Sequence, residues 1–386
     1  MPERLRVAIV GCGNVGAQLH LPAWLACARA RLVALADPAG TALEAAREKA
    51  GLPAGAVHGD PWELIARDDV DALDVCTPQH LRRDLLVAAI EAGKHVLCEK
   101  PLASVPADAA AAVDSAARRG TTLAVVQNFL WLPEIRAALA AIREIGAVRT
   151  VIVNFLGVID VPGSPAYDAN WRHDAARAGG GVLIDMLHGV YVAEALLGQP
   201  FARVSAFVAS RDRDASVEDL ALCRFEAEAG AALVNIAWGY GPGGIEVCGT
   251  EGRVSVRYTA GGTAPWAPLE HVLVETGAGT RIALTGRDDR GPLGLSRTLH
   301  DSFDHVVADF AEAVLDGRPP ASPGADGLRT LEATVAAYES AARGELVALP
   351  LDRGDPVFRS GVLGLRELAL PEWSPARGSL YAAAVR

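Results

Sequence analysis

Three glycines near the start of the chain have the spacing of a phosphate-binding turn. The short apolar run Val7 to Val10 leads directly into Gly11-Cys12-Gly13-Asn14-Val15-Gly16. In such a G-x-G-x-x-G turn between a strand and a helix, the first glycine makes the turn, the second lets the backbone approach a pyrophosphate, and the third allows close helix packing. The N–H groups at the start of the helix bind the anion. The pattern predicts dinucleotide-binding residues at Gly11, Gly13, Asn14, Val15 and Gly16.

An acidic residue follows the next apolar run. Leu32 to Ala36 has the pattern of a second strand, and Asp37 stands 21 residues after Gly16. A carboxylate at this point accepts hydrogen bonds from the adenosine ribose hydroxyls and repels a 2′-phosphate, and residues 38–41 contain no Arg or Lys that could bind one. The sequence therefore favours NAD over NADP. The alternative is that Asp37 only caps the turn after the strand.

A lysine follows a later strand at a position where it could transfer a proton. Lys94 to Cys98 has a strand pattern and is followed by Glu99-Lys100-Pro101. This places Lys100 at the carboxyl edge of a parallel sheet, where open α/β folds bind ligands. An ammonium group can lose its proton beside a cationic nicotinamide, whereas a guanidinium cannot. Lys100 is thus a candidate acid-base group, and the alternative is an ordinary surface lysine.

A second stretch adds to these motifs and makes the chain resemble a known family. It comprises Asn170-Trp171-Arg172 and the run from Gly179-Gly180-Gly181 to Asp185-Met186-Leu187-His188. With it, the sequence resembles the Gfo/Idh/MocA oxidoreductases over residues 5 to about 350. The other matching motifs are Cys76-Thr77-Pro78, Ala92 to Pro101, Val217-Glu218-Asp219 and Gly249 to Gly252.

The resemblance implies an NAD-dependent dehydrogenase or reductase. It would transfer a hydride between nicotinamide and a secondary alcohol or ketone of a sugar, cyclitol or sugar derivative. By the same resemblance Lys100, Asp185 and His188 are catalytic. The residues implied to bind the cofactor, besides the glycine turn and Asp37, are Thr77, Pro78, His80, Glu99, Lys100 and Asn128. Those implied to bind the substrate are Trp171, Arg172, Asp185 and His188, although Trp171 could instead pack in a domain interface.

The chain departs from the family pattern at three places. The family usually separates the Asp and the His by three residues, whereas only two separate Asp185 from His188 here. If both lie on one helix, they still share a face. Arg82 stands where many relatives have a second His, and Phe129-Leu130 stand where many have Arg after Asn128. These changes predict a specialised or more apolar pocket.

Two other functions remain open at this point. Some relatives use bound NAD transiently, to oxidise and re-reduce a sugar during glycosidic cleavage or elimination. The fold also occurs in regulators that sense a nucleotide or a sugar without catalysis. Net NADH production would indicate the dehydrogenase, sugar release without it the hydrolase or lyase, and binding without turnover the sensor.

The order of the expected strands and helices, which must position these residues, predicts an α/β protein. Short apolar runs alternate with helical patterns up to about residue 130, which predicts an N-terminal Rossmann domain with a doubly wound parallel sheet over 1–130. Residues 131–350 then predict a C-terminal substrate-binding and oligomerisation domain of the α/β class, with an open, predominantly antiparallel sheet. The strands expected in it are 148–155, 204–208, 221–225, 231–237 and 245–247, and two helices are expected at 303–316, ending at Gly317, and at 327–343, ending at Gly344. The pattern assigns no element to 255–300. The expected C-terminal extension, 351–386, has no assigned role.

Composition excludes several classes of partner. The 47 acidic and 36 basic residues give a net charge of −11, which argues against nucleic acid and anionic membrane surfaces. No apolar run approaches the length of a membrane span, and no secretory signal is visible, so a cytoplasmic protein is expected. The six cysteines and the scattered His20, His173 and His305 show no metal-ligand spacing, so no metal site and no histidine chemistry is predicted at these positions. A homo-dimer or homo-tetramer is expected, because open sheets commonly bury one face against another subunit.

Overall fold

The computed structural model describes residues 3–158, 172–210, 217–239, 242–259, 267–286 and 297–367. The chain forms two compact units. Among the described residues, the first unit comprises 3–128 and 300–329, and the second comprises the rest. The domain boundaries expected at 130 and 350 stay predictions, and the first unit also takes in a segment, 300–329, that the sequence pattern places in the later domain.

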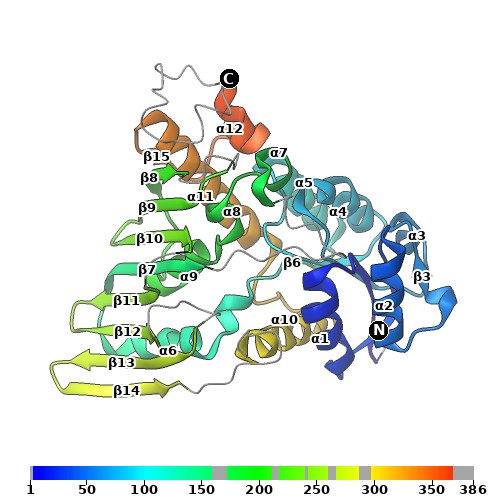
Figure 1. Ribbon diagram of the computed structural model, residues 1–386, viewed down its shortest axis with the longest axis horizontal. Coiled ribbons are helices and arrows are strands. Elements are labelled where there is room, and N and C mark those ends of the chain that lie inside the picture. Colours follow the sequence, from blue (N-terminus) through cyan, green and yellow to red (C-terminus); the bar gives the residue numbers. More distant parts are fainter. Residues whose placement is uncertain are drawn as a thin grey trace. The chain divides into compact units, whose positions relative to one another are not determined.

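The first unit, whose residues 3–128 are blue to cyan in Figure 1, contains a six-stranded parallel sheet in the order β3-β2-β1-β4-β5-β6. This order confirms the predicted Rossmann fold. Its strands are β1 (Leu5–Val10), β2 (Ala30–Ala36), β3 (Val57–His58), β4 (Ala72–Val75), β5 (His95–Cys98) and β6 (Leu123–Val125). Its helices include α1 (Leu21–Ala26), α2 (Gly40–Ala50), α3 (Trp62–Ile65), α4 (Arg82–Glu91), α5 (Pro106–Arg119) and most of α10 (Arg297–Asp316).

Local sequence explains where a helix of this unit begins and ends. Helix α5 starts with Pro106, whose fixed φ suits the first helical turn, and ends at Gly120, which has a φ of +66°. Arg118 and Arg119 occupy its last turn, where positive charge interacts favourably with the helix dipole. The same kind of glycine ends α10, at Gly317, as the sequence predicted.

The second unit contains a nine-stranded sheet in the order β14-β13-β12-β11-β7-β10-β9-β8-β15. All neighbouring strands are antiparallel except β7 and β10. The strands are β7 (Val148–Val158), β8 (Arg203–Ala209), β9 (Leu220–Glu226), β10 (Ala231–Trp238), β11 (Gly244–Gly249), β12 (Gly252–Tyr258), β13 (Leu269–Thr276), β14 (Gly279–Thr285) and β15 (Val347–Ala348). The helices of the second unit include α6 (Pro133–Ala141), α7 (Ala175–Ala178), α8 (Val182–Asp185), α9 (His188–Leu197), most of α11 (Gly324–Arg343) and α12 (Pro356–Ser360). The predicted fold class is therefore confirmed.

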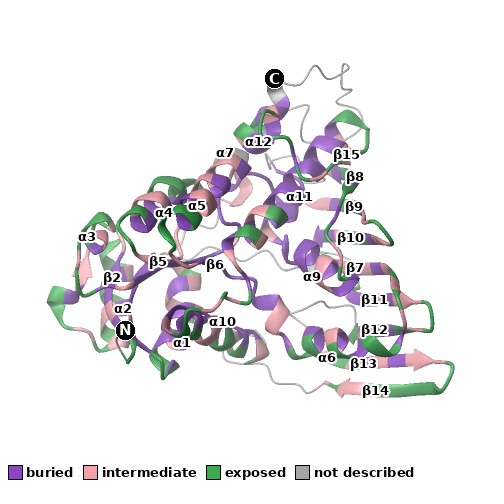
Figure 2. Cartoon of the chain, turned by 180° about the vertical axis from the view of Figure 1, so that it is seen from behind, coloured by how far each residue is buried: buried purple, intermediate pink, exposed green. Residues whose placement is uncertain are grey.

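One face of this second sheet forms the core of the unit. Along β10, Ala232, Val234 and Ile236 are fully buried, and they alternate with more exposed residues. Helix α9 packs so closely on this face that a Cβ added at Gly189 would lie 3.0 Å from the Val234 side chain. Figure 2 shows burial decreasing towards β13 and β14 at the sheet edge.

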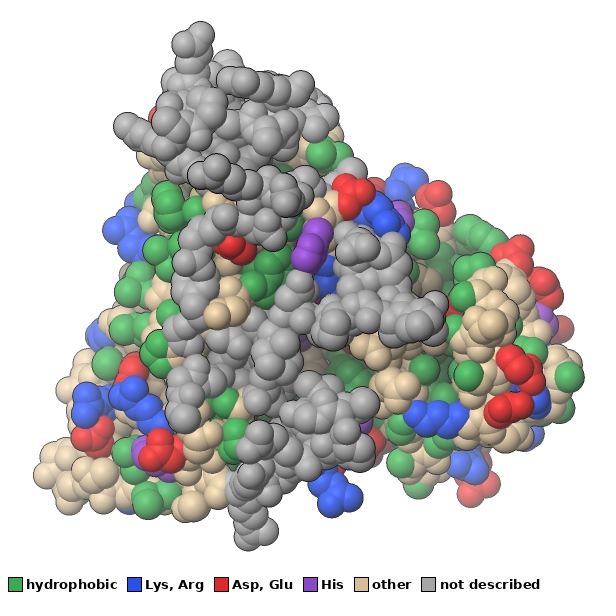
Figure 3. Space-filling view, viewed as in Figure 1, with side chains coloured by type: hydrophobic (Ala, Val, Ile, Leu, Met, Phe, Trp, Pro, Cys, Tyr) green, Lys and Arg blue, Asp and Glu red, His purple; other side chains and the backbone are tan. Residues whose placement is uncertain are grey.

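The described surface has mixed charge. In Figure 3 the acidic and basic side chains of the described residues are interspersed on the visible face. None of the described helices is long and apolar enough to cross a membrane.

Candidate active site

The predicted cofactor-binding residues of the first unit follow the ends of adjacent parallel strands. Strands β1, β4, β5 and β6 end in register at Val10, Val75, Cys98 and Val125. The segments that begin there carry Gly11, Thr77, Lys100 and Asn128. Residues that are far apart in the sequence thus meet at the carboxyl edge of one sheet, which is where such folds bind ligands.

The three glycines of the turn have different surroundings. Gly11 has a φ of +100°, and a Cβ added at Gly16 would lie 2.1 Å from the Gly11 carbonyl oxygen, so both are required by the protein itself. A Cβ at Gly13 would meet nothing within 4 Å among the described residues. The space in front of Gly13 is therefore available to a ligand, next to the exposed Asn14 and the half-buried Val15.

Asp37 is tied to the glycine turn. One carboxylate oxygen accepts the Cys12 N–H at 2.7 Å, and the other accepts the Ala39 N–H at 2.7 Å. The bond to Ala39 caps the turn after the strand, which is the alternative role that the sequence analysis gave for Asp37. The first bond holds the carboxylate beside the turn, and each oxygen keeps a lone pair that can accept from a ribose hydroxyl.

Thr77 provides a test of whether a dinucleotide fits this edge. Its hydroxyl oxygen is buried and has no hydrogen-bond partner among the described residues. An unpaired buried hydroxyl is costly, and a polar ligand would satisfy it. Pro78 beside it is half-buried and His80 is exposed. The unpaired hydroxyl and the open space at Gly13 fit a bound dinucleotide.

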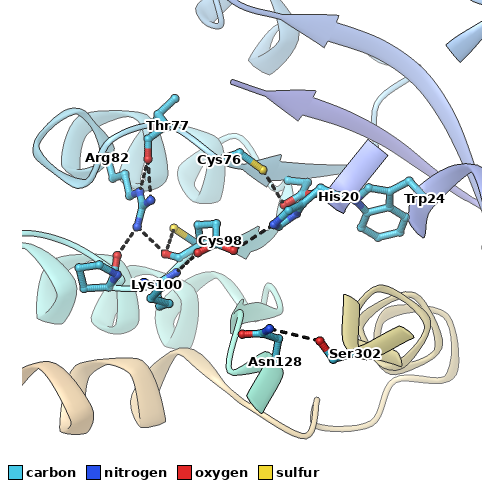
Figure 4. Close-up of polar contacts among 12 residues, drawn as sticks. His20, Trp24, Cys76, Thr77, Arg82, Cys98, Lys100, Asn128 and Ser302 are labelled. Atoms are coloured by element: carbon cyan, nitrogen blue, oxygen red, sulfur yellow. Dashed lines mark hydrogen bonds and ion pairs between the residues drawn. The ribbon is translucent and has the colours of Figure 1, made fainter. Parts of the chain in front are cut away.

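Lys100 lies half-buried in a loop that is fixed from both sides (Figure 4). Its backbone N–H donates to the Glu99 carboxylate at 2.9 Å. The buried guanidinium of Arg82 donates to the carbonyl oxygens of Thr77, Glu99 and Pro101. Arg82, noted above as a departure from the family pattern, is therefore a clamp between the Thr77 and Lys100 segments.

One residue of this edge escaped the sequence analysis. His20, to which no chemistry was assigned, is fully buried, and its ring nitrogens lie 2.7 Å from Asp74 and 3.0 Å from Glu99. These partners are 54 and 79 residues away in the chain, so no local spacing could have indicated them. Glu99, predicted to bind the cofactor, is 6% exposed, and its carboxylate contacts His20 and the Lys100 amide.

Asn128 is buried in the segment that follows strand β6. Its side-chain amide donates to the Ser302 hydroxyl at 3.2 Å (Figure 4). Ser302 lies on α10, a helix that the sequence predicted only from residue 303 onward. Helix α10 therefore orients a predicted cofactor-binding residue.

In the second unit, Asp185 and His188 do not share one helix. Helix α8 ends at Asp185, residues 186 and 187 form a turn, and α9 begins at His188. The condition under which both would share one helical face is therefore not met, because the backbone leaves the helix at Met186, with φ −108° and ψ +32°. Asp185 forms an ion pair with Arg172 at 3.4 Å. Trp171, the neighbouring predicted substrate residue, lies outside the described residues.

His188 is held by aromatic residues. Its Nδ1 lies 2.6 Å from the Tyr191 hydroxyl, which also accepts the Phe129 N–H at 3.1 Å. The Phe129 ring stacks on the imidazole with ring centres 4.0 Å apart. Phe129 belongs to the third departure from the family pattern noted above, so this departure places an apolar ring against the predicted catalytic histidine.

The glycine run before Asp185 is packed against a buried carboxylate. Glu218 accepts the N–H groups of Gly181 and Leu183 and the hydroxyl of Tyr338 at 2.6–3.0 Å. A Cβ at Gly180 would lie 2.4 Å from the Tyr338 hydroxyl, and one at Gly181 would lie 2.2 Å from the Glu218 carbonyl. Burial raises the pKa of Glu218 to about 7, against the opposing effect of these donors. Internal packing thus requires glycine here, a role that the sequence had not indicated.

Comparisons with known proteins agree with this geometry. Residues 5–127 match the model of an oxidoreductase family with an NAD-binding Rossmann fold, and residues 135–255 match that of the GFO/IDH/MocA C-terminal domain. A dTDP-3,4-didehydro-2,6-dideoxy-alpha-D-glucose 3-reductase from Saccharopolyspora spinosa is 31% identical over 340 residues, which are 85% of this chain and 92% of that protein. A D-apiose dehydrogenase from Paraburkholderia graminis is 27% identical over 363 residues, 90% of each chain.

A solved structure extends the likeness to the fold. The crystal structure of aldose-aldose oxidoreductase from Caulobacter crescentus, complexed with glycerol, is 25% identical and has a TM-score of 0.74. The match covers 90% of this chain and 100% of that one. The strand order, the glycine turn and both domain matches lead to one conclusion: the chain belongs to the GFO/IDH/MocA family of oxidoreductases, whose N-terminal domain is an NAD-binding Rossmann fold.

Proposed function

We propose that this protein is an NAD-dependent dehydrogenase or reductase that interconverts a secondary alcohol and a ketone on a sugar, cyclitol or sugar derivative. The observation that carries the proposal is the Lys100 loop. The loop is fixed by Glu99 and Arg82 at the sheet edge where Thr77 has an unpaired hydroxyl and Gly13 faces open space. The names of the relatives, which include D-apiose dehydrogenase and myo-inositol 2-dehydrogenase, support the substrate class.

The residues that would hold NAD lie just after the carboxyl ends of the parallel strands. The turn of Gly11, Gly13, Asn14, Val15 and Gly16 would bind the pyrophosphate, and Asp37 would accept from the adenosine ribose. Thr77, Pro78, His80, Glu99 and Asn128 would complete the site at the neighbouring strand ends. Bound NAD would supply the hydride acceptor at its nicotinamide ring.

We propose that Lys100 and His188 handle the proton of the reacting hydroxyl. One removes the proton as the alcohol is oxidised, or returns it to the carbonyl in reduction, and a positioned acid or base of this kind contributes about 10²- to 10⁴-fold. Tyr191 and Phe129 fix the orientation of the His188 ring. Asp185, with Arg172 and Trp171, would bind or orient the substrate.

The first experiment is a substrate panel. Reduction of NAD⁺ and NADP⁺ is followed by absorbance with cyclitols, hexoses, aminosugars and their glycosides, on the wild-type protein and on Lys100→Ala. Turnover with NAD⁺ is expected to fall at least about a hundredfold in Lys100→Ala while NADH affinity is kept. Lys49→Ala, which changes a lysine on helix α2, is the matched control. Unchanged turnover in Lys100→Ala would contradict the assignment.

We further propose a homo-dimer or homo-tetramer that works in the cytoplasm. The second sheet exposes apolar side chains on the face opposite its core, namely Phe207, Leu222 and Leu233. An apolar sheet face of this kind supports burial against another copy of the chain. All six cysteines are free thiols, which is typical of a reducing compartment.

A further inference from the structure

Three buried charged side chains form a continuous chain of hydrogen bonds inside the first unit. Asp74 lies 2.7 Å from Nδ1 of His20, and Nε2 of His20 lies 3.0 Å from Glu99. The other Glu99 oxygen accepts the Lys100 backbone N–H at 2.9 Å. The chain of contacts therefore runs from strand β4 through His20 to the loop of the proposed catalytic lysine (Figure 4).

The contacts determine the charge of His20. Each ring nitrogen faces a carboxylate oxygen, and two ionised carboxylates can only accept, so both nitrogens donate and the ring is an imidazolium. Burial lowers the pKa of His20, but the charge of Asp74 and its hydrogen bond outweigh this effect and hold the pKa well above the ordinary value. Burial raises the pKa of Glu99, and the His20 bond and charge, with Lys100 and Arg82, bring it below the ordinary value.

The remaining neighbours of the ring are not ionised. Cys76 and Cys98 are thiols, since burial raises their pKa to well above neutrality. The Phe303 ring, on α10, packs against the imidazole at an interplanar angle of 61° with ring centres 4.9 Å apart, and Trp24 donates to Asp74 at 2.6 Å. Asp74 and Glu99 are thus the anions that keep the imidazolium charged.

His20, Asp74 and Cys76 lie close enough together to suggest a metal site, but the hydrogen bonds of His20 do not fit one. The ligand atoms of His20, Asp74 and Cys76 lie within 4.8 Å of one another. However, the His20 nitrogen is in direct hydrogen-bond contact with Asp74 at 2.7 Å, and the second His20 nitrogen is engaged by Glu99. A metal needs the ring nitrogen as an unprotonated donor, whereas this geometry keeps it protonated.

We propose that His20 is a positioning residue for Lys100, acting through Glu99. The imidazolium neutralises the buried Glu99 carboxylate, so that the carboxylate can accept the Lys100 N–H, while Arg82 holds the carbonyl oxygens of residues 99 and 101. Without the imidazolium, the buried Glu99 would lose the cation that is hydrogen-bonded to it, and it would either take up a proton or turn away. The first response weakens its hydrogen bond to the Lys100 N–H, and the second breaks that bond. The functional part of this inference rests on the proposed role of Lys100.

The low lysine content permits a direct test that needs no substrate. The chain has lysines only at positions 49, 94 and 100, so the full-length protein labelled with [15N]lysine gives three backbone amide signals, which Lys49→Arg and Lys94→Arg assign. The Lys100 signal is expected to move in His20→Gln. It should stay in place in His58→Gln, the matched control, which removes a histidine–carboxylate contact at β3. An unmoved Lys100 signal in folded His20→Gln would overturn the proposal.

A second variant keeps the test decisive if His20→Gln does not fold. In the wild type, the Lys100 signal is expected to stay constant as the pH passes the ordinary pKa of histidine, because the imidazolium keeps its proton there. Asp74→Asn removes one of its two anions, so His20 should lose its proton at a lower pH than in the wild type and shift the Lys100 signal as it does so. A Lys100 signal that does not change with pH in either protein would refute the proposal that His20 acts on Lys100 through Glu99.

Kinetics then separate positioning from general stability. With a substrate from the panel, kcat of His20→Gln is expected to fall at least about tenfold, because small misplacements of a reacting group are costly. The affinity for NADH should match that of His58→Gln. Equal kcat values for the two variants would overturn the functional part. If the signal moves but Lys100→Ala keeps full turnover, the positioning stands and the proposed function of Lys100 fails.

Discussion

Gly13 and Gly16 belong to one motif but are required for different reasons. The space beside Gly13 is open, so Gly13→Ala should fold with an unchanged midpoint of thermal unfolding and lose affinity for NADH, since a methyl group would occupy the place of the pyrophosphate. Gly16→Ala should lower the midpoint itself, because its Cβ would lie 2.1 Å from the Gly11 carbonyl oxygen, and overpacking of this kind costs about 1–3 kcal/mol. Calorimetry measures the unfolding midpoint of each variant, and fluorescence titration measures its affinity for NADH. Equal loss of stability in the two variants would contradict this division.

Asp37 should set the choice between NAD and NADP. Asp37→Ser removes the negative charge that would face a 2′-phosphate, and like charges placed together cost several kcal/mol. The ratio of kcat/KM for NADP⁺ to that for NAD⁺ is therefore expected to rise at least about tenfold. Asp37 also accepts the Cys12 N–H, so the unfolding midpoint should be measured in parallel to exclude damage to the turn. An unchanged ratio with a normal midpoint would show that another residue selects the cofactor.

Spacing along the chain predicts some site residues and hides others. Gly11 to Gly16 and Lys100 could be predicted because each motif is short and follows a strand directly. The role of His20 could not be predicted, because it depends on contacts with Asp74 and Glu99. These residues are distant in the sequence, and the fold of the parallel sheet brings them to His20. Arg82 was noticed only as a departure, and its carbonyl contacts required the loop geometry.

At the scale of elements, buried strands were easier to predict than the edge of the second sheet. Strands β7 to β10 were predicted because apolar residues mark their buried face. Within 255–300, left unassigned by the sequence pattern, the structure has β13 and β14. Every residue of β14 is at least partly exposed, so the strand has no buried face and lacks the alternation that would identify it.

Glu218 should make the loop between Gly179 and Asp185 sensitive to pH. Burial raises the folded-state pKa of Glu218 to about 7, above the ordinary value of 4.5. The folded state then binds a proton more tightly than the unfolded state, so this group's contribution to stability is fully present below about pH 4.5 and is lost as the pH rises through about 7. Glu218→Gln keeps an oxygen for the Gly181, Leu183 and Tyr338 donors without the charge.

The measurement is the unfolding midpoint between pH 5 and pH 8. The wild type is expected to lose more stability over this range than Glu218→Gln, with the two proteins diverging towards pH 8. Glu332, on α11, is the comparison, since burial raises the pKa of its carboxyl as well, to about 6, so Glu332→Gln is measured in parallel. Parallel curves for the wild type and Glu218→Gln would show that the donors keep the Glu218 carboxylate ionised.

At the scale of the whole molecule, the exposed face of the second sheet determines the expected assembly. Phe207 on β8 and Leu222 on β9 are directly opposite in the sheet and are 52% and 41% exposed, and Leu233 on β10 is 38% exposed. Strand alternation places them opposite the core face that carries Val208, Ala221 and Val234. Such a face is unfavourable in water and is typical of a subunit interface.

Charges placed on this face should therefore separate the subunits without unfolding them. The double variant Phe207→Glu/Leu222→Glu puts like charges on directly opposite residues, which would repel each other and a second copy of the chain. Light scattering coupled to size exclusion should show a dimer or tetramer for the wild type and a monomer for the variant. Ile282→Glu is the control, since it introduces the same charge at an exposed apolar residue of the edge strand β14 and should leave the assembly intact. A wild-type monomer, or an intact assembly in the double variant, would mean that this face does not join the subunits.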